Sequence, residues 1–281
     1  MKQLPIRVLV GRLLSAMLMA CSLASSVSAA EPDVELWRLD CGSIDNGDLD
    51  AYSDTFAYVG ESMTFTVSCY LVRSGERYLL WDTGLSSAML GKEVTEDVYR
   101  MRLERLLTDQ LQKIGVAADQ IGYLSVSHYH FDHTGQAAAF PGAKLLVDRR
   151  DWEVIQGRGD LAKDFTPWIT GGSEVETLTY DKDVFGDGSV MLLRTPGHTP
   201  GHRSLLVRLK DRGPVLLTGD AAHFRENWRS DGVPGFNTNR AETIASIHRL
   251  KEIADQLGAT VVIGHEPDDI GKLAAFPESI R

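Results

Sequence analysis

The chain has 281 residues, of which 43% are hydrophobic and 24% are charged, and its formal net charge at pH 7 is −10. These proportions are typical of a globular protein and exclude a collagen-like or disordered chain. The negative charge also argues against nucleic acid as a partner, because an acidic surface repels phosphate groups.

The first 30 residues have the pattern of a secretory signal peptide. Lys2, Arg7 and Arg12 precede the apolar stretch LLSAMLMACSLA, and the small residues of SVSAA follow it. This stretch is shorter than the roughly 20 residues that a membrane-spanning helix needs. We therefore expect residues 1–30 to be removed, leaving 26 basic against 39 acidic residues, a net charge of −13. The mature protein is expected to be periplasmic or secreted.

The three cysteines leave two questions open. LMAC, which ends at Cys21, resembles a bacterial lipoprotein cleavage site, so a membrane-anchored lipoprotein is the alternative localisation. Contact with a membrane is expected only in that case. Cys41 and Cys69 remain in the mature chain, and they either form a disulfide in an oxidising compartment or stay as buried free thiols.

The first half of the mature chain contains mostly strand patterns with short connections. Runs rich in β-branched and aromatic residues predict strands at VELWRLD, MTFTVSCYLVR, ERYLLWDTG and YLSVS, the first three of them antiparallel. The stretch DVYRMRLERLLTDQLQKIG, residues 97–115, has apolar residues at helical spacing. It is predicted to be one helix that stops at Gly115.

The second half repeats this organisation. Strands are predicted at KLLVD, SVMLLRT, SLLVRLK, PVLLTGD and ATVVIGHEP, and a helix over residues 239–258 with a capping box from Asn239 to Glu242. No linker separates the halves, so residues 31–281 are expected to form a single domain. An α/β fold with four layers, an αβ/βα sandwich, fits best, although periodicity leaves other α/β arrangements open.

Metal-type side chains stand at the ends of four predicted strands, where a rigid sheet can hold them. In an extended segment, residues i and i+2 point the same way. The first two histidines of SHYHFDHTG can therefore converge on one ion, while the following turn directs its aspartate and third histidine toward another. The first site takes His128, His130 and His198, the second takes Asp132, His133 and His265, and Asp220 bridges both.

Nitrogen and oxygen ligands without thiolate favour two Zn²⁺ ions and leave Mn²⁺, Fe²⁺ and Co²⁺ as alternatives. Three or four protein ligands per ion leave room for water, which is typical of a catalytic site. A lone histidine is more often structural, so His202, His223 and His248 carry no such prediction on their own.

The order HYHFDH, GHTPGH, GD and GH resembles the metallo-β-lactamase superfamily over nearly all of the mature chain. Within it, the stretches HFDHTG, TPGHTPGH, RENWRSDGVPGFN, ASIHRLKEI, GHEP and FPESI are similar to the N-acyl homoserine lactonases. The resemblance implies the αβ/βα sandwich with a dinuclear site at the edge between its sheets, and the same ligand assignment that spacing predicts. It also implies interference with quorum sensing.

The implied reaction opens the ring of an N-acyl homoserine lactone by attack of a metal-bridging hydroxide. The family uses the backbone amide at the position of Phe131 for substrate contact. It commonly carries a tyrosine three residues after the bridging aspartate, where this chain has His223, whose imidazole can also donate a hydrogen bond. Asp220, His223 and Asp132 are the catalytic candidates, with Asp132 weaker as a proton shuttle than as a ligand. Asp82 is a candidate for orienting a ligand histidine.

Aromatic residues are candidates for an acyl-chain groove, although ordinary packing accounts for most of them. They are Tyr52, Phe56, Tyr58, Phe165 and Trp168, with Phe56 and Trp168 taken forward as substrate contacts. The alternative functions are an organophosphate triesterase, another esterase of the same fold, or a non-catalytic metal-binding protein. The bridging Asp220 argues against a β-lactam hydrolase, which the resemblance associates with cysteine at that position. A homodimer is left open.

Overall fold

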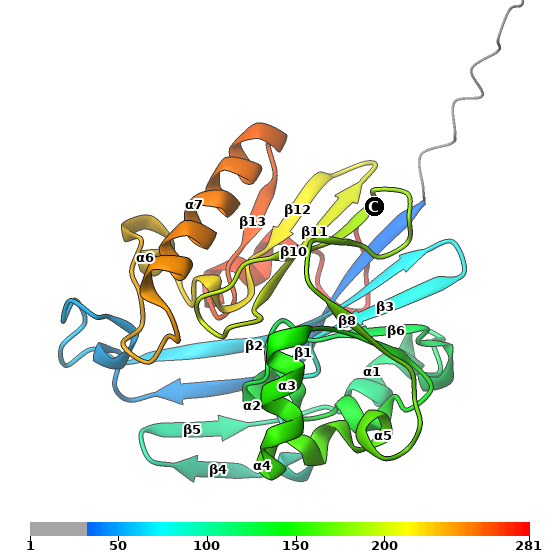
Figure 1. Ribbon diagram of the computed structural model, residues 1–281, viewed down its shortest axis with the longest axis horizontal. Coiled ribbons are helices and arrows are strands. Elements are labelled where there is room, and N and C mark those ends of the chain that lie inside the picture. The colour runs from blue at the N-terminus through cyan, green and yellow to red at the C-terminus, as the bar shows by residue number, and fades with distance from the viewer. Residues whose placement is uncertain (1–32) are drawn as a thin grey trace, which may run out of the picture. The chain divides into compact units, whose positions relative to one another are not determined.

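The computed structural model describes residues 33–281, which belong to one compact unit (Figure 1). The predicted signal peptide at residues 1–30 and the lipidation alternative at Cys21 lie outside the described residues, so both stay predictions. None of the helices within residues 33–281 combines the length and apolar character needed to cross a membrane.

The first sheet has eight strands in the order β4-β5-β1-β2-β3-β6-β7-β8. They are β1 Val34–Asn46, β2 Met63–Ser74, β3 Arg77–Trp81, β4 Glu93–Glu96, β5 Tyr99–Arg102, β6 Tyr123–Ser125, β7 Lys144–Asp148 and β8 Val175–Leu178. Strands β1, β2 and β3 are antiparallel, as predicted, whereas β3 and β6 are parallel. The carboxyl ends of β3 and β6 therefore meet at one edge of the sheet.

The second sheet has five strands in the order β13-β12-β11-β10-β9. They are β9 Lys182–Asp183, β10 Val190–Arg194, β11 Arg203–Leu209, β12 Gly213–Leu217 and β13 Thr260–Val262. Strands β10 and β12 both run antiparallel to β11 between them, and β13 is parallel to β12. Because β10, β12 and β13 point the same way, their carboxyl ends also share one edge.

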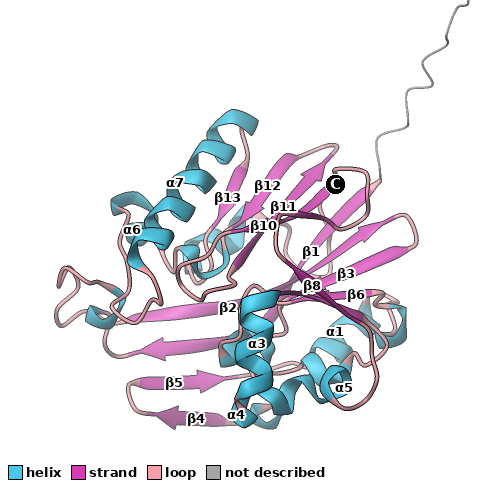
Figure 2. Cartoon of the chain, viewed as in Figure 1, coloured by secondary structure: helices cyan, strands magenta, loops and turns pink. Residues whose placement is uncertain are grey.

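Alternating side chains build the layers of the molecule. Leu205 and Val207 of β11 join the apolar cluster shared with the first sheet, whereas Leu206 between them packs in the cluster that contains Leu250 of helix α7, Arg240–Leu257. Helices cover the outer face of each sheet (Figure 2). They are α1 Leu107–Lys113, α3 Arg149–Gly157, α4 Gly159–Ala162 and α5 Thr166–Ile169 on the first sheet and α6 Arg225–Ser230 and α7 Arg240–Leu257 on the second. The predicted four-layer αβ/βα sandwich is confirmed.

Helix α7 matches the prediction for residues 239–258 closely. The Asn239 side chain accepts a hydrogen bond from the Glu242 backbone nitrogen at 3.0 Å, which satisfies a free donor of the first turn. Gly258 ends the helix in the left-handed conformation, with φ of +60°.

The single helix predicted over residues 97–115 is wrong. Only Leu107–Lys113 is helical, and Tyr99–Arg102 forms β5, which pairs with β1 and β4. The local sequence also fits a period of two, because Met101 is buried while Arg100 and Arg102 on either side form ion pairs with Asp45. Pairing with β1 decides the choice, and periodicity within the segment cannot show that contact.

The two cysteines of the mature chain are joined. Cys41 of β1 and Cys69 of β2 form a disulfide, with their Cα atoms 5.8 Å apart. The free-thiol alternative is therefore excluded for this structure.

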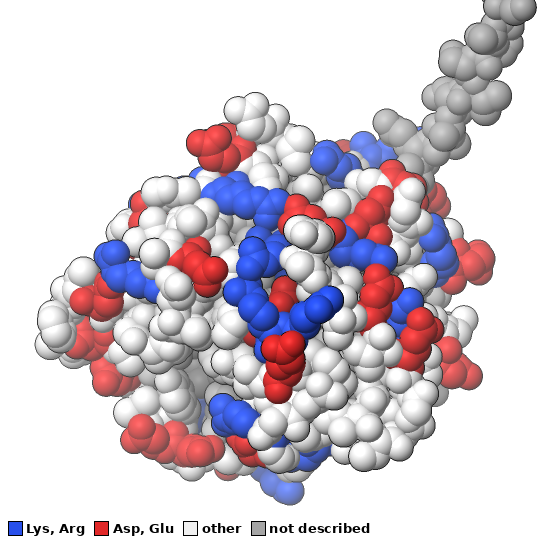
Figure 3. Space-filling view, in the orientation of Figure 1, with Lys and Arg blue, Asp and Glu red and all other residues white. Residues whose placement is uncertain are grey.

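On the surface, acidic and basic side chains are interspersed over the face shown in Figure 3.

Candidate functional site

The predicted ligands all lie in the segments that follow a strand, where the two sheets approach each other. His128, His130, Asp132 and His133 follow β6, His198 follows β10, Asp220 follows β12, and His265 follows β13. Asp132 and His133 belong to the short helix α2, Phe131–Thr134. The side chains fall into the two groups that spacing predicts, one with His128, His130, His198 and Asp220, the other with Asp132, His133 and His265.

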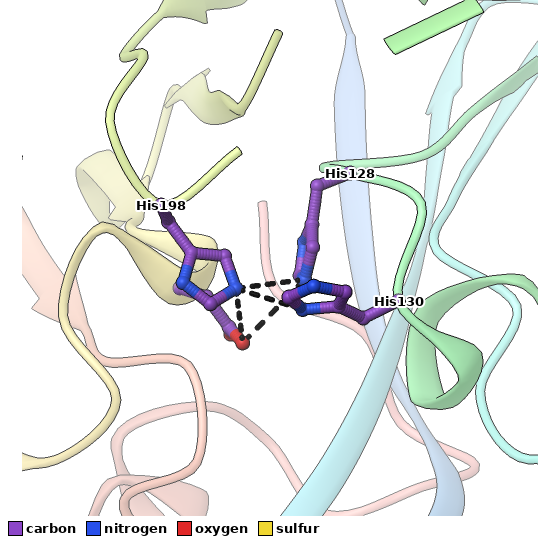
Figure 4. Close-up of side chains that lie close together, drawn as sticks. His128, His130 and His198 are labelled. Atoms are coloured by element: carbon purple, nitrogen blue, oxygen red, sulfur yellow. Dashed lines mark hydrogen bonds and ion pairs between the residues drawn. The ribbon is translucent and has the colours of Figure 1, made fainter. Parts of the chain in front are cut away.

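Three imidazole nitrogens converge in the first group (Figure 4). The Nε2 atom of His198 lies 3.1 Å from Nε2 of His128 and 2.9 Å from Nδ1 of His130. His198 Nδ1 lies 2.8 Å from Oδ1 of Asn237, whose amide nitrogen donates to the Thr243 hydroxyl. Because this fixes the Asn237 amide, Nδ1 of His198 must be the donor. The Nε2 atom of a neutral His198 therefore carries a lone pair and points it at the other two rings.

Burial keeps these rings neutral. It lowers the pKa of His128 and His198 well below the usual value, and it lowers the pKa of His130 to about 4. Converging lone pairs of neutral imidazoles repel one another unless a cation lies between them. This first group of residues therefore fits a metal ion, and nitrogen ligands of this kind suit Zn²⁺.

His265 presents the same arrangement in the second group. Its Nδ1 donates to the backbone oxygen of Thr66 at 3.0 Å, so the lone pair of a neutral ring is on Nε2. That Nε2 lies 3.1 Å from Oδ1 of Asp220 and 3.5 Å from Oδ2 of Asp132. Burial acts to lower the pKa of His265, but the carboxylates of Asp220 and Asp132 outweigh it and raise that pKa. The surroundings of Nε2 therefore favour a positive charge, which a divalent cation supplies.

His133 completes the second group. Its Nδ1 lies 2.9 Å from Oδ2 of Asp82, and its buried Nε2 has no hydrogen-bond partner among the described residues. Burial acts to lower the pKa of His133, but the carboxylates of Asp132, Asp220 and Asp82 outweigh it and raise that pKa well above the usual value. The surroundings of Nε2 thus favour a positive charge, which a divalent cation supplies.

Asp220 lies between the two groups. Its Oδ2 faces Nε2 of His198 at 3.5 Å and of His128 at 3.7 Å, while its Oδ1 faces Nε2 of His133 at 3.5 Å and of His265 at 3.1 Å. One carboxylate oxygen is therefore directed at each group. The side chain has the position required of a bridging ligand.

Buried residues behind the ligands hold them in place. Asp82, in the left-handed conformation with φ of +61°, accepts from the Ser127 backbone nitrogen at 2.6 Å as well as contacting His133. Asp151 of α3 accepts from the Thr199 hydroxyl at 2.7 Å and from the Gly201 backbone nitrogen at 2.6 Å. Both residues lie in the loop that follows His198. Contacts of this kind orient ligands and restrict their motion.

A mainly apolar cavity of about 190 Å³ opens onto both groups. It is lined by Ile44, Tyr52, Phe65, Tyr99, His130, Phe131, Asp132, His198, Asp220, His223, Phe236 and His265. Phe131 and His223 line the cavity, as their predicted roles require. His223 Nε2 lies 3.2 Å from Oδ2 of Asp220.

Two of the predicted substrate contacts do not lie at the cavity. The prediction for Trp168 is wrong, because its ring is buried in the core and its Nε1 donates to the Ala143 backbone oxygen at 2.9 Å. Phe56 does not line the cavity and is 77% exposed on the loop after β1. Of the five aromatic candidates, only Tyr52 reaches the cavity.

Sequence reasoning missed four cavity residues: Ile44, Phe65, Tyr99 and Phe236. Tyr99 lies in the segment for which the sequence wrongly predicts a helix. Phe236 lies in RENWRSDGVPGFN, a stretch that carried the family resemblance but no assigned role. Ile44 belongs to β1 and Phe65 to β2. Which of the alternating side chains of these paired strands faces the cavity depends on how the sheet packs in the folded protein.

These features define a metal-dependent hydrolase site in an αβ/βα sandwich. A family model for the metallo-beta-lactamase superfamily matches residues 63–265, and the chain belongs to that superfamily. It is a hydrolase of that superfamily, and its curated relatives include N-acyl homoserine lactonases.

Two curated relatives illustrate this resemblance. The N-acyl homoserine lactonase AttM of Azorhizobium caulinodans is 37% identical over 184 residues, which cover 61% of this chain and 69% of that protein. The N-acyl homoserine lactonase of a Bacillus species is 34% identical over 231 residues, which cover 79% of this chain and 89% of that protein. The similarity thus extends over most of the hydrolase unit.

Solved structures of N-acyl homoserine lactone hydrolases are similar to this chain as well. A quorum-quenching N-acyl homoserine lactone hydrolase superposes with a TM-score of 0.75 and 29% identity, covering 88% of this chain and 98% of that chain. An N-acyl homoserine lactone hydrolase with the product N-hexanoyl-L-homoserine bound at its catalytic metal centre superposes with a TM-score of 0.74 at the same identity and coverage.

Proposed function

We propose that the protein hydrolyses the lactone ring of N-acyl homoserine lactones and thereby interferes with quorum sensing. The observation that carries this proposal is the pair of ligand groups joined by Asp220 at the base of a mainly apolar cavity. Similarity to lactonases along most of the chain, including one with a ring-opened product at its metal centre, supports the substrate class.

Two divalent ions complete the proposed site, and the nitrogen and oxygen ligands favour zinc. Such ions, when bound, supply a water of lowered pKa as nucleophile and polarise the carbonyl oxygen of the substrate. His128, His130 and His198 would hold one ion, and Asp132, His133 and His265 the other. Asp220, with one oxygen directed at each group, would fix the distance between the ions.

The remaining cavity residues bind and orient the substrate in this proposal. Phe131 is the first residue of α2, so its backbone N–H has no partner within the helix and is available to a substrate oxygen. His223 lines the cavity beside Asp220, which supports a role as a hydrogen-bond donor at the reacting carbonyl. Asp132 also lines the cavity, and its role as a ligand is a stronger proposal than proton transfer.

We also propose that the protein acts in the periplasm or outside the cell. The signal-type sequence of residues 1–30 supports export, and so does the Cys41–Cys69 disulfide, because such bonds persist in oxidising compartments. Anchoring through Cys21 is the alternative, and membrane contact would follow only from it.

The test is hydrolysis by the purified protein spanning residues 31–281, loaded with zinc. A short-chain and a long-chain N-acyl homoserine lactone are assayed beside paraoxon and a cephalosporin, with Asp220→Asn as the inactive control. We expect lactone turnover to exceed the other two reactions by orders of magnitude. Cleavage of paraoxon with negligible lactone turnover would instead identify a phosphotriesterase.

A further inference from the structure

Two tyrosine hydroxyls meet at the wall of the cavity. Tyr52 ends a short helical turn, Asp50–Tyr52, that follows β1, and Tyr99 begins β5. Both side chains line the cavity that Asp132 and Asp220 also line, and their hydroxyl oxygens are 3.3 Å apart. They come from segments almost 50 residues apart in the chain, so only the folded sheet brings them together.

The two hydroxyl groups have one proton more than the hydrogen bond between them uses. Two hydroxyl groups carry two protons, and the bond between them uses one. Within residues 33–281, neither hydroxyl makes a hydrogen bond to any other protein group. The second proton is therefore free to bind an acceptor that enters the cavity.

Tyr52 is the better placed of the two to use that proton. Its ring packs edge-on against His223 with centroids 4.9 Å apart, and His223 in turn lies beside Asp220. Phe65 and Phe236 hold the same ring edge-on at 5.1 Å each. A ring packed on three sides keeps its hydroxyl in one place, which lowers the entropy cost of a hydrogen bond.

The fixed backbone of Tyr52 and the protonation of its hydroxyl also suit it to donate a hydrogen bond. Its backbone oxygen accepts from the buried Asn227 side chain at 3.1 Å, so the main chain is fixed as well as the ring. Burial, assisted by Tyr99, Asp132 and Asp220, raises the pKa of the Tyr52 hydroxyl above its usual value. The hydroxyl therefore stays protonated throughout the neutral range.

We propose that the Tyr52 hydroxyl donates a hydrogen bond to the amide carbonyl of the N-acyl substrate, while Tyr99 donates to Tyr52. This assignment rests on the proposed function for the identity of the substrate. The ring carbonyl of a lactone must lie at the ligand groups to be attacked, beside Phe131 and His223, which line the same cavity. The amide carbonyl, farther along the substrate, is then the acceptor for the free hydroxyl proton at the aromatic wall formed by Tyr52, Phe65 and Phe236. An unsatisfied carbonyl there would weaken binding. Tyr52 would thus select acylated lactones over lactones without an amide.

The test compares Tyr52→Phe, Tyr99→Phe and the unchanged protein on N-hexanoyl homoserine lactone and on γ-decanolactone, which has an alkyl chain but no amide. Tyr52→Phe should lower kcat/KM for the acylated lactone about tenfold, mainly through KM, and leave γ-decanolactone nearly unchanged. Tyr99→Phe should have a smaller effect in the same direction. Bound metal and thermal stability should not change in either variant.

Tyr58→Phe is the matched control, because Tyr58 is also buried and receives a 3.4 Å contact from Asn227 but does not line the cavity. It should behave as the unchanged protein. Equal losses on both lactones, or no loss in Tyr52→Phe, would overturn the proposal while leaving lactone hydrolysis intact.

A binding measurement separates this proposal from the proposed function. Calorimetric titration of N-hexanoyl-homoserine, the ring-opened product, needs no turnover. If the unchanged protein shows no lactonase activity but binds this amide about tenfold more tightly than Tyr52→Phe does, the proposed function fails and the role of Tyr52 stands. Equal affinities, or no binding to either protein, would overturn the role of Tyr52.

Discussion

Single side chains with two contacts set the chemistry of the site, and Asp220 is the principal example. Four imidazole nitrogens of the ligand groups surround its two oxygens at 3.1 to 3.7 Å, two for each oxygen, and Nε2 of His223 lies 3.2 Å from Oδ2 as well. Burial acts to raise the pKa of Asp220, but the surrounding histidines outweigh it and hold that pKa well below the usual value. An anionic carboxylate at this point would allow two cations to share one ligand.

Replacing Asp220 with Asn should therefore affect both ligand groups. The amide is neutral and offers only one oxygen, so we expect bound zinc to fall from two ions per chain to one or fewer. Lactone kcat/KM should fall by more than about a hundredfold. Elemental analysis after gel filtration, together with the lactone assay, measures both effects. Two tightly bound ions and full activity in Asp220→Asn would contradict the bridging assignment.

His202→Ala is the control for that experiment. His202 is buried near the first ligand group, but its Nδ1 contacts the Thr195 backbone oxygen at 3.0 Å, and burial lowers its pKa to about 3. It belongs to neither ligand group. The variant is expected to keep two zinc ions per chain, although losing a buried ring should lower its stability.

The sequence predicted the candidate ligands better than it predicted the cavity wall. Ligand candidates such as His198 and His265 can be recognised because residue type and position after a strand are both visible in the sequence. An aromatic residue gives no comparable local sign, since core and cavity positions have the same composition. Trp168 is predicted as a substrate contact and Tyr52 is not, yet tertiary packing places Trp168 in the core and Tyr52 at the cavity.

Among the elements, loops fastened to neighbouring helices and strands fix the ligands. Helix α3 was not predicted, yet its Asp151 holds the loop that carries His198 through Thr199 and Gly201. Gly201 allows this approach, because a Cβ there would lie 2.7 Å from Oδ1 of Asp151. Strong apolar periodicity identified β2 and α7, whereas α3 depends on contacts between segments distant in the sequence.

Asp151 should also make stability depend on pH. Burial outweighs the hydrogen bonds from Thr199 and Gly201 and raises the pKa of Asp151 from 3.8 to about 7. A carboxyl group with a higher pKa in the folded state binds protons more tightly when folded. Its contribution to stability is present at low pH and is lost as the pH rises toward 7.

Asp151→Asn cannot titrate at this position and should not show that loss. The free energy of unfolding of the variant, relative to the unchanged protein, should therefore rise by about 2 kcal/mol between pH 5 and pH 8. Urea unfolding of both zinc-loaded proteins at the two pH values measures this difference, and shared contributions cancel. A constant difference would mean that Asp151 is already ionised at pH 5.

The disulfide supports the turn that carries Asp82. Leu85 donates its backbone N–H to the Cys41 backbone oxygen at 3.2 Å. Gly84 lies against the same residue, because a Cβ on Gly84 would be 2.4 Å from Cys41 Cβ. The turn that orients His133 through Asp82 therefore rests on the strand pair that the disulfide joins.

Replacing Cys41 and Cys69 together with Ala should lower stability without emptying the site. Joining cysteines 28 residues apart in sequence restricts the unfolded chain. Its loss should cost about 3 to 4 kcal/mol of unfolding free energy, or roughly 10 °C in Tm. Two zinc ions should remain, because the contact with Leu85 uses only backbone atoms. Calorimetry and elemental analysis test both statements, and an unchanged Tm would contradict the first.

At the scale of the whole molecule, each ligand group joins the two sheets. His128 and His130 follow β6 of the first sheet, whereas His198 and Asp220 follow β10 and β12 of the second. The second group likewise takes Asp132 and His133 from one sheet and His265 from the other. Bound ions would therefore connect the halves of the sandwich, which are otherwise held mainly by the apolar cluster between them.

Removing the ions should consequently destabilise the whole fold and not only the site. A ligand present at about 100 times its Kd adds about 2.7 kcal/mol to the stability of the folded state, so two such ions add roughly 5 kcal/mol. For a chain of this length, that corresponds to roughly 10 to 20 °C in Tm. Dialysis against a chelator should lower the Tm by this amount in one cooperative transition, and adding zinc should restore it. Asp220→Asn should show a much smaller zinc-dependent shift than the unchanged protein. A Tm that does not respond to chelation, with the ions removed, would mean that the apolar cluster alone joins the sheets and that the ligand groups are assembled before any ion binds.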